Sequence, residues 1–127
     1  MCRREKPKRA RQGQIYYVDL KEGKGSEQMG RRPLLIISSD QYNRNSPTVI
    51  MVSITSKIKR ADLNVHIKLP PMKGLNKESM VEAENHFTVD KSRLEDYCGR
   101  LPWYVWIKVH RAIRFSIQTS RKQYEEE

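Results

Sequence analysis

The sequence predicts a mainly β protein, a small barrel of short strands with one helix appended near the C-terminus. Short runs rich in β-branched and aromatic residues recur between residues 15 and 89, and such runs favour strands. Residues that favour turns separate the runs. Apolar residues at helical spacing follow Pro102. Five or more strands before one helix indicate a barrel with an appended helix rather than an alternating α/β fold.

The first two strands are predicted at residues 15–20 and 34–38. Tyr16 and Tyr17 are consecutive in the first strand, so one ring should face the core and the other a groove or solvent. A polar loop with three glycines separates the strands at residues 21–32. Because long loops in small domains tend to be functional, this loop is a candidate site.

The strongest strand prediction falls at residues 48–54, where the nearly continuous apolar run T-V-I-M-V-S-I indicates a central position in the sheet. A turn rich in Asn, Ser and Pro precedes it at residues 40–47. Residues 65–69 alternate in the manner of a half-buried strand. Two further short strands are predicted at residues 79–83 and 86–89.

The remaining elements are helical. The carboxylate of Asp90 should cap a brief helical turn that runs to Leu94. Pro102 suits the first turn of a helix, which is expected to extend to about residue 120. Helical spacing predicts its buried face to contain Val105, Val109, Ala112, Ile113, Ser116 and Ile117.

The chain of 127 residues suits one domain and carries a net charge of +10. Six of the first twelve residues are Arg or Lys, so we expect a flexible basic arm at residues 1–12, a folded domain at residues 13–120 and a charged tail at residues 121–127. The folded part remains net positive without the arm, which indicates a polyanionic partner such as nucleic acid. Solubility is the alternative explanation for the excess charge.

Several functional classes are disfavoured. No apolar run approaches the length of a membrane helix and no secretory signal is evident, so we expect a cytoplasmic protein without a membrane partner. The three histidines, His66, His86 and His110, lack the spacing of a zinc motif, and no phosphate-binding glycine loop is present. We therefore expect neither a metal nor a cofactor.

Two segments stand out. G-S-E-Q-M-G-R-R-P occupies residues 25–33, directly before a predicted buried strand, and I-T-S-K occupies residues 54–57, at the end of the central strand. In order and spacing they resemble the MazF/PemK family of toxins, small endoribonucleases of bacterial type II toxin–antitoxin pairs. The resemblance extends through N-R-N-S-P-T, E-S-M-V and T-V-D-K-S-R-L, and spans roughly residues 11 to 117.

The resemblance implies an SH3-like barrel of antiparallel strands with short helices and a C-terminal α-helix, assembled as a homodimer. It implies sequence-specific, metal-independent cleavage of single-stranded RNA, including mRNA, which inhibits translation and growth. It further implies a cognate antitoxin, similar to MazE, that binds through an acidic and partly disordered segment.

Carried over by position, the resemblance makes Arg32 and Thr55 the catalytic residues. The positions implied to bind RNA are Ser26, Glu27, Gln28, Ser56, Lys57, Ser79, Glu84 and Asn85. Arg31 is expected to be a solvated neighbour. RNA can be cleaved by its own 2′-hydroxyl, so an arginine fork and a neutral hydroxyl suffice to stabilise charge on the phosphoryl oxygens. Whether Arg32 also transfers a proton is open.

Two other classes of function compete with this interpretation. One is a non-enzymatic toxin on a similar barrel, resembling CcdB, which binds DNA gyrase. The other is a basic nucleic-acid-binding module without activity. The combination of the two segments at residues 25–33 and 54–57 favours the ribonuclease.

Overall fold

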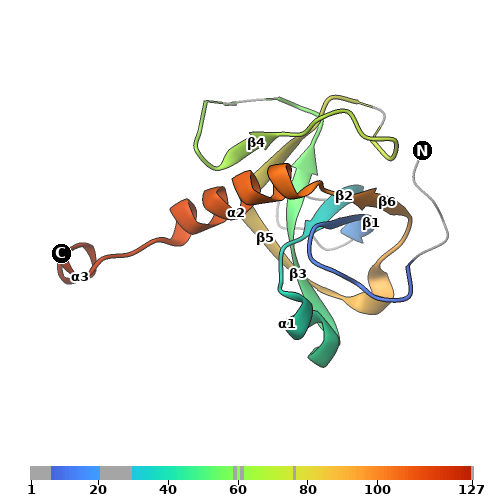
Figure 1. Cartoon of the computed structure of the whole chain (residues 1–127), viewed down its shortest axis with the longest axis horizontal. Helices are drawn as coiled ribbons and strands as arrows, with labels where there is room; N and C mark the ends of the chain where they lie inside the picture. The colour runs from blue at the N-terminus through green and yellow to red at the C-terminus, as the bar shows by residue number, and fades with distance from the viewer. Residues whose placement is uncertain (1–6, 21–29, 59, 61, 76, 127) are drawn as a thin grey trace.

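A curled, six-stranded antiparallel sheet forms the body of the protein, as the strand pattern predicts (Figure 1). The computed structural model describes residues 7–20, 30–58, 60, 62–75 and 77–126. The strand order is β4-β5-β3-β2-β1-β6, so the sheet is a half-barrel with β4 and β6 at its two edges. The strands are β1 (Gln14–Leu20), β2 (Gly30–Ile36), β3 (Thr48–Thr55), β4 (His66–Lys68), β5 (Met80–Asp90) and β6 (Tyr97–Arg100).

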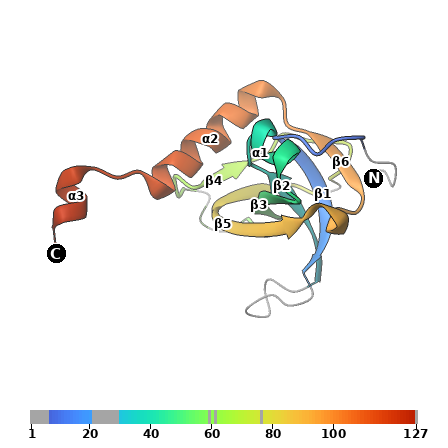
Figure 2. The same cartoon turned by 90° about the horizontal axis from the view of Figure 1, so that it is seen from below.

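In the part of the chain that the structure describes, the α-helices beside the sheet are α1 (Asp40–Asn45), α2 (Trp103–Ile117) and α3 (Arg121–Glu125). The helix α2 crosses one face of the sheet, after which the chain runs away from the body to α3 (Figure 2). The predicted helix near the C-terminus is thus confirmed, although it ends at Ile117 and a separate short helix follows. None of the helices among the described residues is long and apolar enough to cross a membrane.

The strand β2 begins at Gly30, earlier than predicted, because the residues assigned to a loop pair with β1. Arg31 lies opposite Asp19, and Arg32 lies opposite Val18. Pro33 suggested that the strand starts after it, since proline cannot donate a ladder hydrogen bond. The pairing of β2 with β3 begins only at the next residue, so the missing N–H of Pro33 interrupts no ladder on that side.

Two predicted strands at residues 79–83 and 86–89 are one continuous strand, β5. Its pairing with β3 shifts register at the boundary between Val52 and Ser53, where Val52 lies opposite His86 but Ser53 lies opposite Glu82. Residues 83–85 are therefore extra on β5 and form a bulge, which bends a strand and redirects its side chains. In the sequence, the polar residues Glu84 and Asn85 of this bulge resemble a break between two strands.

Two further elements differ from the prediction. Residues 40–45 form a helix rather than an irregular turn, because the Ser39 hydroxyl accepts a hydrogen bond from the Tyr42 N–H and caps it. The edge strand β6 was not predicted, since Y-C-G-R shows little β pattern and gains its ladder from β1. By contrast, the Asp90 carboxylate caps a 3₁₀ turn at Lys91–Arg93 as expected.

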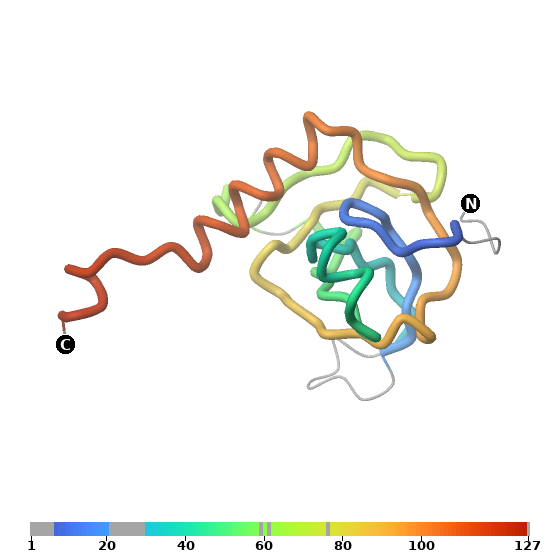
Figure 3. Tube along the Cα trace, turned by 60° about the horizontal axis from the view of Figure 1, so that its bottom comes forward, coloured from blue at the N-terminus to red at the C-terminus, as the bar shows by residue number. Residues whose placement is uncertain are grey.

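The sheet separates two apolar clusters. On one face, the α2 residues Val105, Trp106 and Val109 pack against the sheet. The other cluster contains Tyr16 and lies on the opposite side of β1. In the Cα trace the sheet curls round, with α1 against β3 (Figure 3). Of the residues predicted for the buried face of α2, Val105, Val109 and Ala112 are buried, Ile113 is half-buried, and Ser116 and Ile117 are exposed because α2 runs beyond the sheet.

Candidate functional site

A cleft of ≈480 Å³ lies where the start of β2, the end of β3 and the start of β5 come together. It brings together six of the predicted site residues, namely Arg32, Thr55, Ser56, Lys57, Ser79 and Asn85. Ser26, Glu27 and Gln28 lie outside the described residues. Tyr17 also lines the cleft while Tyr16 is buried in the core, which confirms the prediction for this pair.

The antiparallel register explains why Arg32 and Thr55 meet. Leu34 of β2 lies opposite Ser53 of β3. Continuing that register by two residues places Arg32 opposite Thr55. Residues opposite each other on antiparallel strands point to the same face of the sheet. Two residues that are far apart in sequence therefore share one wall of the cleft, where the hydrogen-bonded ladder between the strands has ended.

The hydroxyl of Thr55 is oriented by its own turn. Its Oγ1 accepts a hydrogen bond of 3.1 Å from the backbone N–H of Lys57. This arrangement occupies a lone pair and leaves the hydroxyl proton to donate. Thr55 thus presents a neutral donor at the mouth of the cleft, beside the exposed side chains of Ser56 and Lys57.

Arg31 is exposed, as predicted, but it also has partners that were not predicted. Its Nε donates to Glu95 Oε1 at 2.7 Å and its terminal nitrogen donates to Asp96 Oδ2 at 2.6 Å. The guanidinium also lies 4.4 Å from the centre of the Tyr17 ring, within the range of a cation–π contact. The hydrogen bond to Glu95, joined by that to Asp96, raises the pKa of Arg31 despite some desolvation. Neither acidic partner was apparent from the sequence, because Glu95 and Asp96 follow β5 and so lie far from Arg31 along the chain.

The guanidinium of Arg32 behaves differently. It is half-buried at the cleft, and it makes no hydrogen bond or ion pair with any residue that the structure describes. Its planar fork of donors is therefore available to an anionic ligand, whereas the charge of Arg31 is already matched by two carboxylates.

A chain of hydrogen bonds that the sequence analysis missed runs beneath the cleft. The hydroxyl of buried Ser53 donates to Glu82 Oε1 at 2.7 Å and accepts from Asn85 Nδ2 at 3.0 Å. Glu82 lines the cleft together with Asn85. One signal could have suggested this chain: Ser53 is the lone polar residue inside the apolar run of β3.

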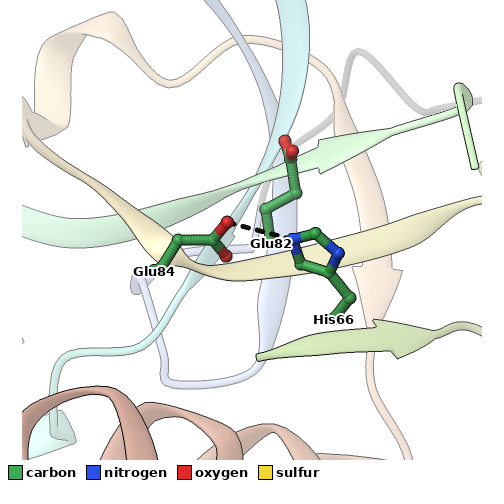
Figure 4. Close-up of side chains that lie close together, drawn as sticks. All are labelled: His66, Glu82 and Glu84. Atoms are coloured by element: carbon green, nitrogen blue, oxygen red, sulfur yellow. Dashed lines mark hydrogen bonds and ion pairs between the residues drawn. The ribbon is translucent and has the colours of Figure 1, made fainter. Parts of the chain in front are cut away.

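Two predicted RNA-binding residues have other partners. The hydroxyl of buried Ser79 donates to the Lys77 carbonyl at 2.9 Å, although Ser79 still lines the cleft. Glu84 is not among the lining residues, because the bulge directs it to His66 on β4, where Oε2 lies 2.9 Å from His66 Nε2 (Figure 4). Asn85 enters the cleft and Glu84 does not.

The cleft is cationic. Arg32, Lys57 and Lys77 line it, in addition to Arg31 whose charge Glu95 and Asp96 match, against the single carboxylate of Glu82 among the described lining residues. Together with the net charge of +10, this lining suits a phosphate-bearing ligand. Fold and site thus define a small protein with a half-barrel sheet and a basic, hydroxyl-bearing cleft at the ends of its strands.

Comparison with known proteins agrees with this description. Residues 11–117 match the family of PemK-like, MazF-like toxins of type II toxin–antitoxin systems. The chain is 37% identical over 108 residues to endoribonuclease EndoA of Bacillus subtilis, covering 84% of this chain and 93% of the relative. It is 38% identical over 108 residues to endoribonuclease MazF of Staphylococcus saprophyticus, covering 84% and 90%. The chain therefore belongs to the MazF/PemK toxin family.

Solved structures have the same fold. A mycobacterial endoribonuclease in complex with its cognate antitoxin superposes with a TM-score of 0.74 at 25% identity, covering 87% of this chain and 97% of that one. MazF from Deinococcus radiodurans superposes with a TM-score of 0.73 at 23% identity, covering 89% and 100%. The half-barrel sheet with its C-terminal helix is thus the architecture of this family.

Proposed function

We propose that this protein is a sequence-specific, metal-independent endoribonuclease that cleaves single-stranded RNA, including mRNA, and thereby inhibits translation and growth. The observation that carries the proposal is the meeting of Arg32, whose guanidinium has no partner among the described residues, with the oriented hydroxyl of Thr55 at one cationic cleft. Family membership and the names of the relatives support the same activity.

The reaction needs positioning and charge stabilisation. The 2′-oxygen of the substrate forms a bond to the adjacent phosphorus as the bond from phosphorus to the 5′-oxygen breaks. The 2′-hydroxyl loses a proton and the departing 5′-oxygen gains one, which yields a 2′,3′-cyclic phosphate and a 5′-hydroxyl. Arg32 would hold two phosphoryl oxygens through its fork, and Thr55 would donate its hydroxyl proton as a hydrogen bond.

The other cleft residues would bind the RNA on either side of the reacting phosphate. Lys57 supplies a mobile positive charge and Ser56 a hydroxyl, both exposed after β3. Asn85 offers amide groups that can read the edge of an unpaired base, and the Ser53 hydroxyl holds its Nδ2 in place. The predicted contacts of Ser26, Glu27, Gln28 and Ser79 are part of this proposal, and Glu84 would contact RNA outside the cleft, where it lies beside His66.

The biological setting follows from the same relatives. We infer a cytoplasmic homodimer controlled by a cognate antitoxin, similar to MazE, whose acidic segment covers the cleft. The mycobacterial relative solved with its antitoxin supports such a partner. A basic cleft attracts an acidic peptide for the same electrostatic reason that it attracts RNA.

The test is cleavage of a defined single-stranded RNA by purified protein in excess EDTA, with the products identified by mass spectrometry. We expect fragments that end in a 2′,3′-cyclic phosphate and begin with a 5′-hydroxyl. The same oligonucleotide with a 2′-deoxyribose at the cleaved position should remain intact, because it lacks the nucleophile. Activity that requires added magnesium, or that survives on the deoxy substrate, would reject the mechanism.

A further inference from the structure

Three potential metal ligands meet on the side of the sheet beside the cleft, from residues that no spacing motif connects. His66 lies on β4, and Glu82 and Glu84 lie on β5 (Figure 4). His66 is directly opposite Glu82 in the register of the two strands. The bulge after Glu82 brings Glu84, two residues further along β5, to the same imidazole. The ligand atoms of the three side chains all lie within 4.8 Å of one another.

Both ring nitrogens of His66 face oxygen atoms. Its Nδ1 lies 2.8 Å from the backbone carbonyl oxygen of Arg60, and its Nε2 lies 2.9 Å from Glu84 Oε2. A neutral imidazole has one N–H. When that N–H donates to the carbonyl through Nδ1, the lone pair of Nε2 faces an oxygen that also carries lone pairs. An imidazolium avoids this conflict with a second N–H, and a metal ion between Nε2 and the carboxylate would take the place of that proton.

The orientation is that of a metal-binding histidine. Such residues usually donate one ring N–H to a carbonyl or carboxylate, which fixes the tautomer and directs the other nitrogen at the metal. Here the Arg60 carbonyl would take that role. The His66 side chain is 8% exposed, which holds the ring in place, whereas Glu84 is 43% exposed and leaves an open side for water ligands.

We propose that His66 Nε2, Glu82 and Glu84 bind one divalent transition-metal ion, for which Zn²⁺ is the probe. One imidazole and two carboxylates suit such an ion. Ligand distances of about 2.0–2.2 Å separate neighbouring ligand atoms of a tetrahedral site by roughly 3.4 Å. To bind the metal, His66 Nε2 and Glu84 Oε2, now 2.9 Å apart, would move slightly away from each other. The carboxylate of Glu82 would move slightly closer to both.

The site would communicate with the cleft through Glu82. This carboxylate accepts the Ser53 hydroxyl through Oε1, and Ser53 in turn accepts from Asn85. His66, Glu82 and Ser53 are consecutive members of one cross-strand row. A metal bound to Glu82 would weaken the hydrogen bond between Glu82 and the Ser53 hydroxyl. The side chain of Asn85, which donates to Ser53, would then shift. The proposal assigns the metal no part in RNA cleavage, so it stands or falls independently of the proposed activity.

Calorimetric titration of Zn²⁺ into the chelator-treated full-length protein tests the site. We expect one ion per chain, with protein protons released to the buffer on binding. His66→Gln and Glu84→Gln should each weaken binding by at least about tenfold, since even residues that support a ligand contribute about 10–100-fold. His110→Gln, on the exposed face of α2, is the matched control and should bind as the unaltered chain does.

Amide NMR spectra locate the ion and check folding. Zn²⁺ should shift the backbone signals of residues 66, 82 and 84 and the side-chain amide of Asn85, and these shifts should be absent in Glu84→Gln. Because Glu84 is largely exposed, this variant should retain the unaltered spectrum elsewhere. Unchanged affinity in both His66→Gln and Glu84→Gln, or shifts confined to other histidines, would overturn the proposal. Absence of binding at millimolar Zn²⁺ would overturn it as well.

Discussion

Arg31 and Arg32 are adjacent on β2 and line the same cleft, yet Glu95 and Asp96 hold Arg31 while Arg32 has no partner among the described residues. Successive residues of a strand point to opposite faces, so neighbouring arginines meet different surroundings. Arg31 meets acidic residues that follow β5 and the ring of Tyr17. Arg32 lies beside Thr55 on one wall of the cleft, which makes it the arginine able to bind a phosphate.

Replacing Arg32 with alanine should abolish most of the RNA cleavage. Loss of one preorganised donor to a transition-state oxyanion typically costs about 10²–10³ in rate. The matched variant Arg31→Ala removes the same charge from the next residue, but one that acidic side chains already neutralise, and should lower the rate by less than about tenfold. Single-turnover cleavage rates measure both. Equal losses in the two variants would show that the cleft responds to net charge alone.

Thr55→Val should slow cleavage strongly, because it removes the hydroxyl donor and retains the shape of the side chain at the end of β3. Thr55→Ser should recover much of the rate, since the hydroxyl can still accept the Lys57 N–H and donate to the substrate. The comparison of kcat for the two variants measures this, with circular dichroism as the check on folding. A fully active Thr55→Val would assign the donor to another residue.

The chain should form a homodimer, because α2 leaves large apolar side chains exposed that a partner subunit would cover. Trp103 is 72% exposed and Ile117 is 68% exposed. Light scattering at micromolar concentration should give a mass of about twice 15.0 kDa. A mass of one chain across that range of concentration would contradict the expectation.

Antitoxin and RNA should compete for the protein, and added salt should weaken both associations. Each partner would place negative groups against Lys57, Lys77 and Arg32, so each association would release counterions. Titrating antitoxin peptide against a labelled RNA, at two salt concentrations, measures the competition. A parallel titration of protein lacking residues 1–9 tests the basic arm without removing Gln12, which hydrogen-bonds Asp40 and the Ile37 carbonyl, and the arm should add affinity for RNA without altering the competition. A ternary complex of all three molecules would reject a shared cleft.

Gly74→Ala should destabilise the fold more than Gly30→Ala. A Cβ at Gly74 would lie 2.3 Å from the carbonyl oxygen of Cys98, and backbone atoms cannot move aside. Overpacking of this kind costs about 1–3 kcal/mol or more. A Cβ at Gly30 meets no atom within 4 Å, so its cost is confined to the positive φ of +95°. Thermal unfolding of the two variants measures the difference, and equal melting temperatures would disprove the clash.

Local patterns in the sequence were sufficient to predict the elements whose residues show a clear periodicity or a capping signal. The apolar run of β3, the strand at β1, the capping by Asp90 and the helix after Pro102 all follow from neighbouring residues. The segments at residues 25–33 and 54–57 also pointed to the family, because each is a contiguous motif. These features depend on interactions within a few residues, and a linear pattern records them.

Pairing between strands decided the rest. Arg31 and Arg32 became part of β2 because β1 lies beside them, and the two short strands became the bulged β5 because β3 continues past the break. The β2–β3 register, continued by two residues, places Arg32 beside Thr55, and the registers of β5 with β3 and β4 pair Glu82 with Ser53 and His66. Cross-strand neighbours are set by hydrogen-bond register over long separations, which residue spacing along the chain does not encode. Contiguous motifs are thus enough to assign the family and the strand-forming segments, whereas the side chains that share the cleft follow only from how the strands pair.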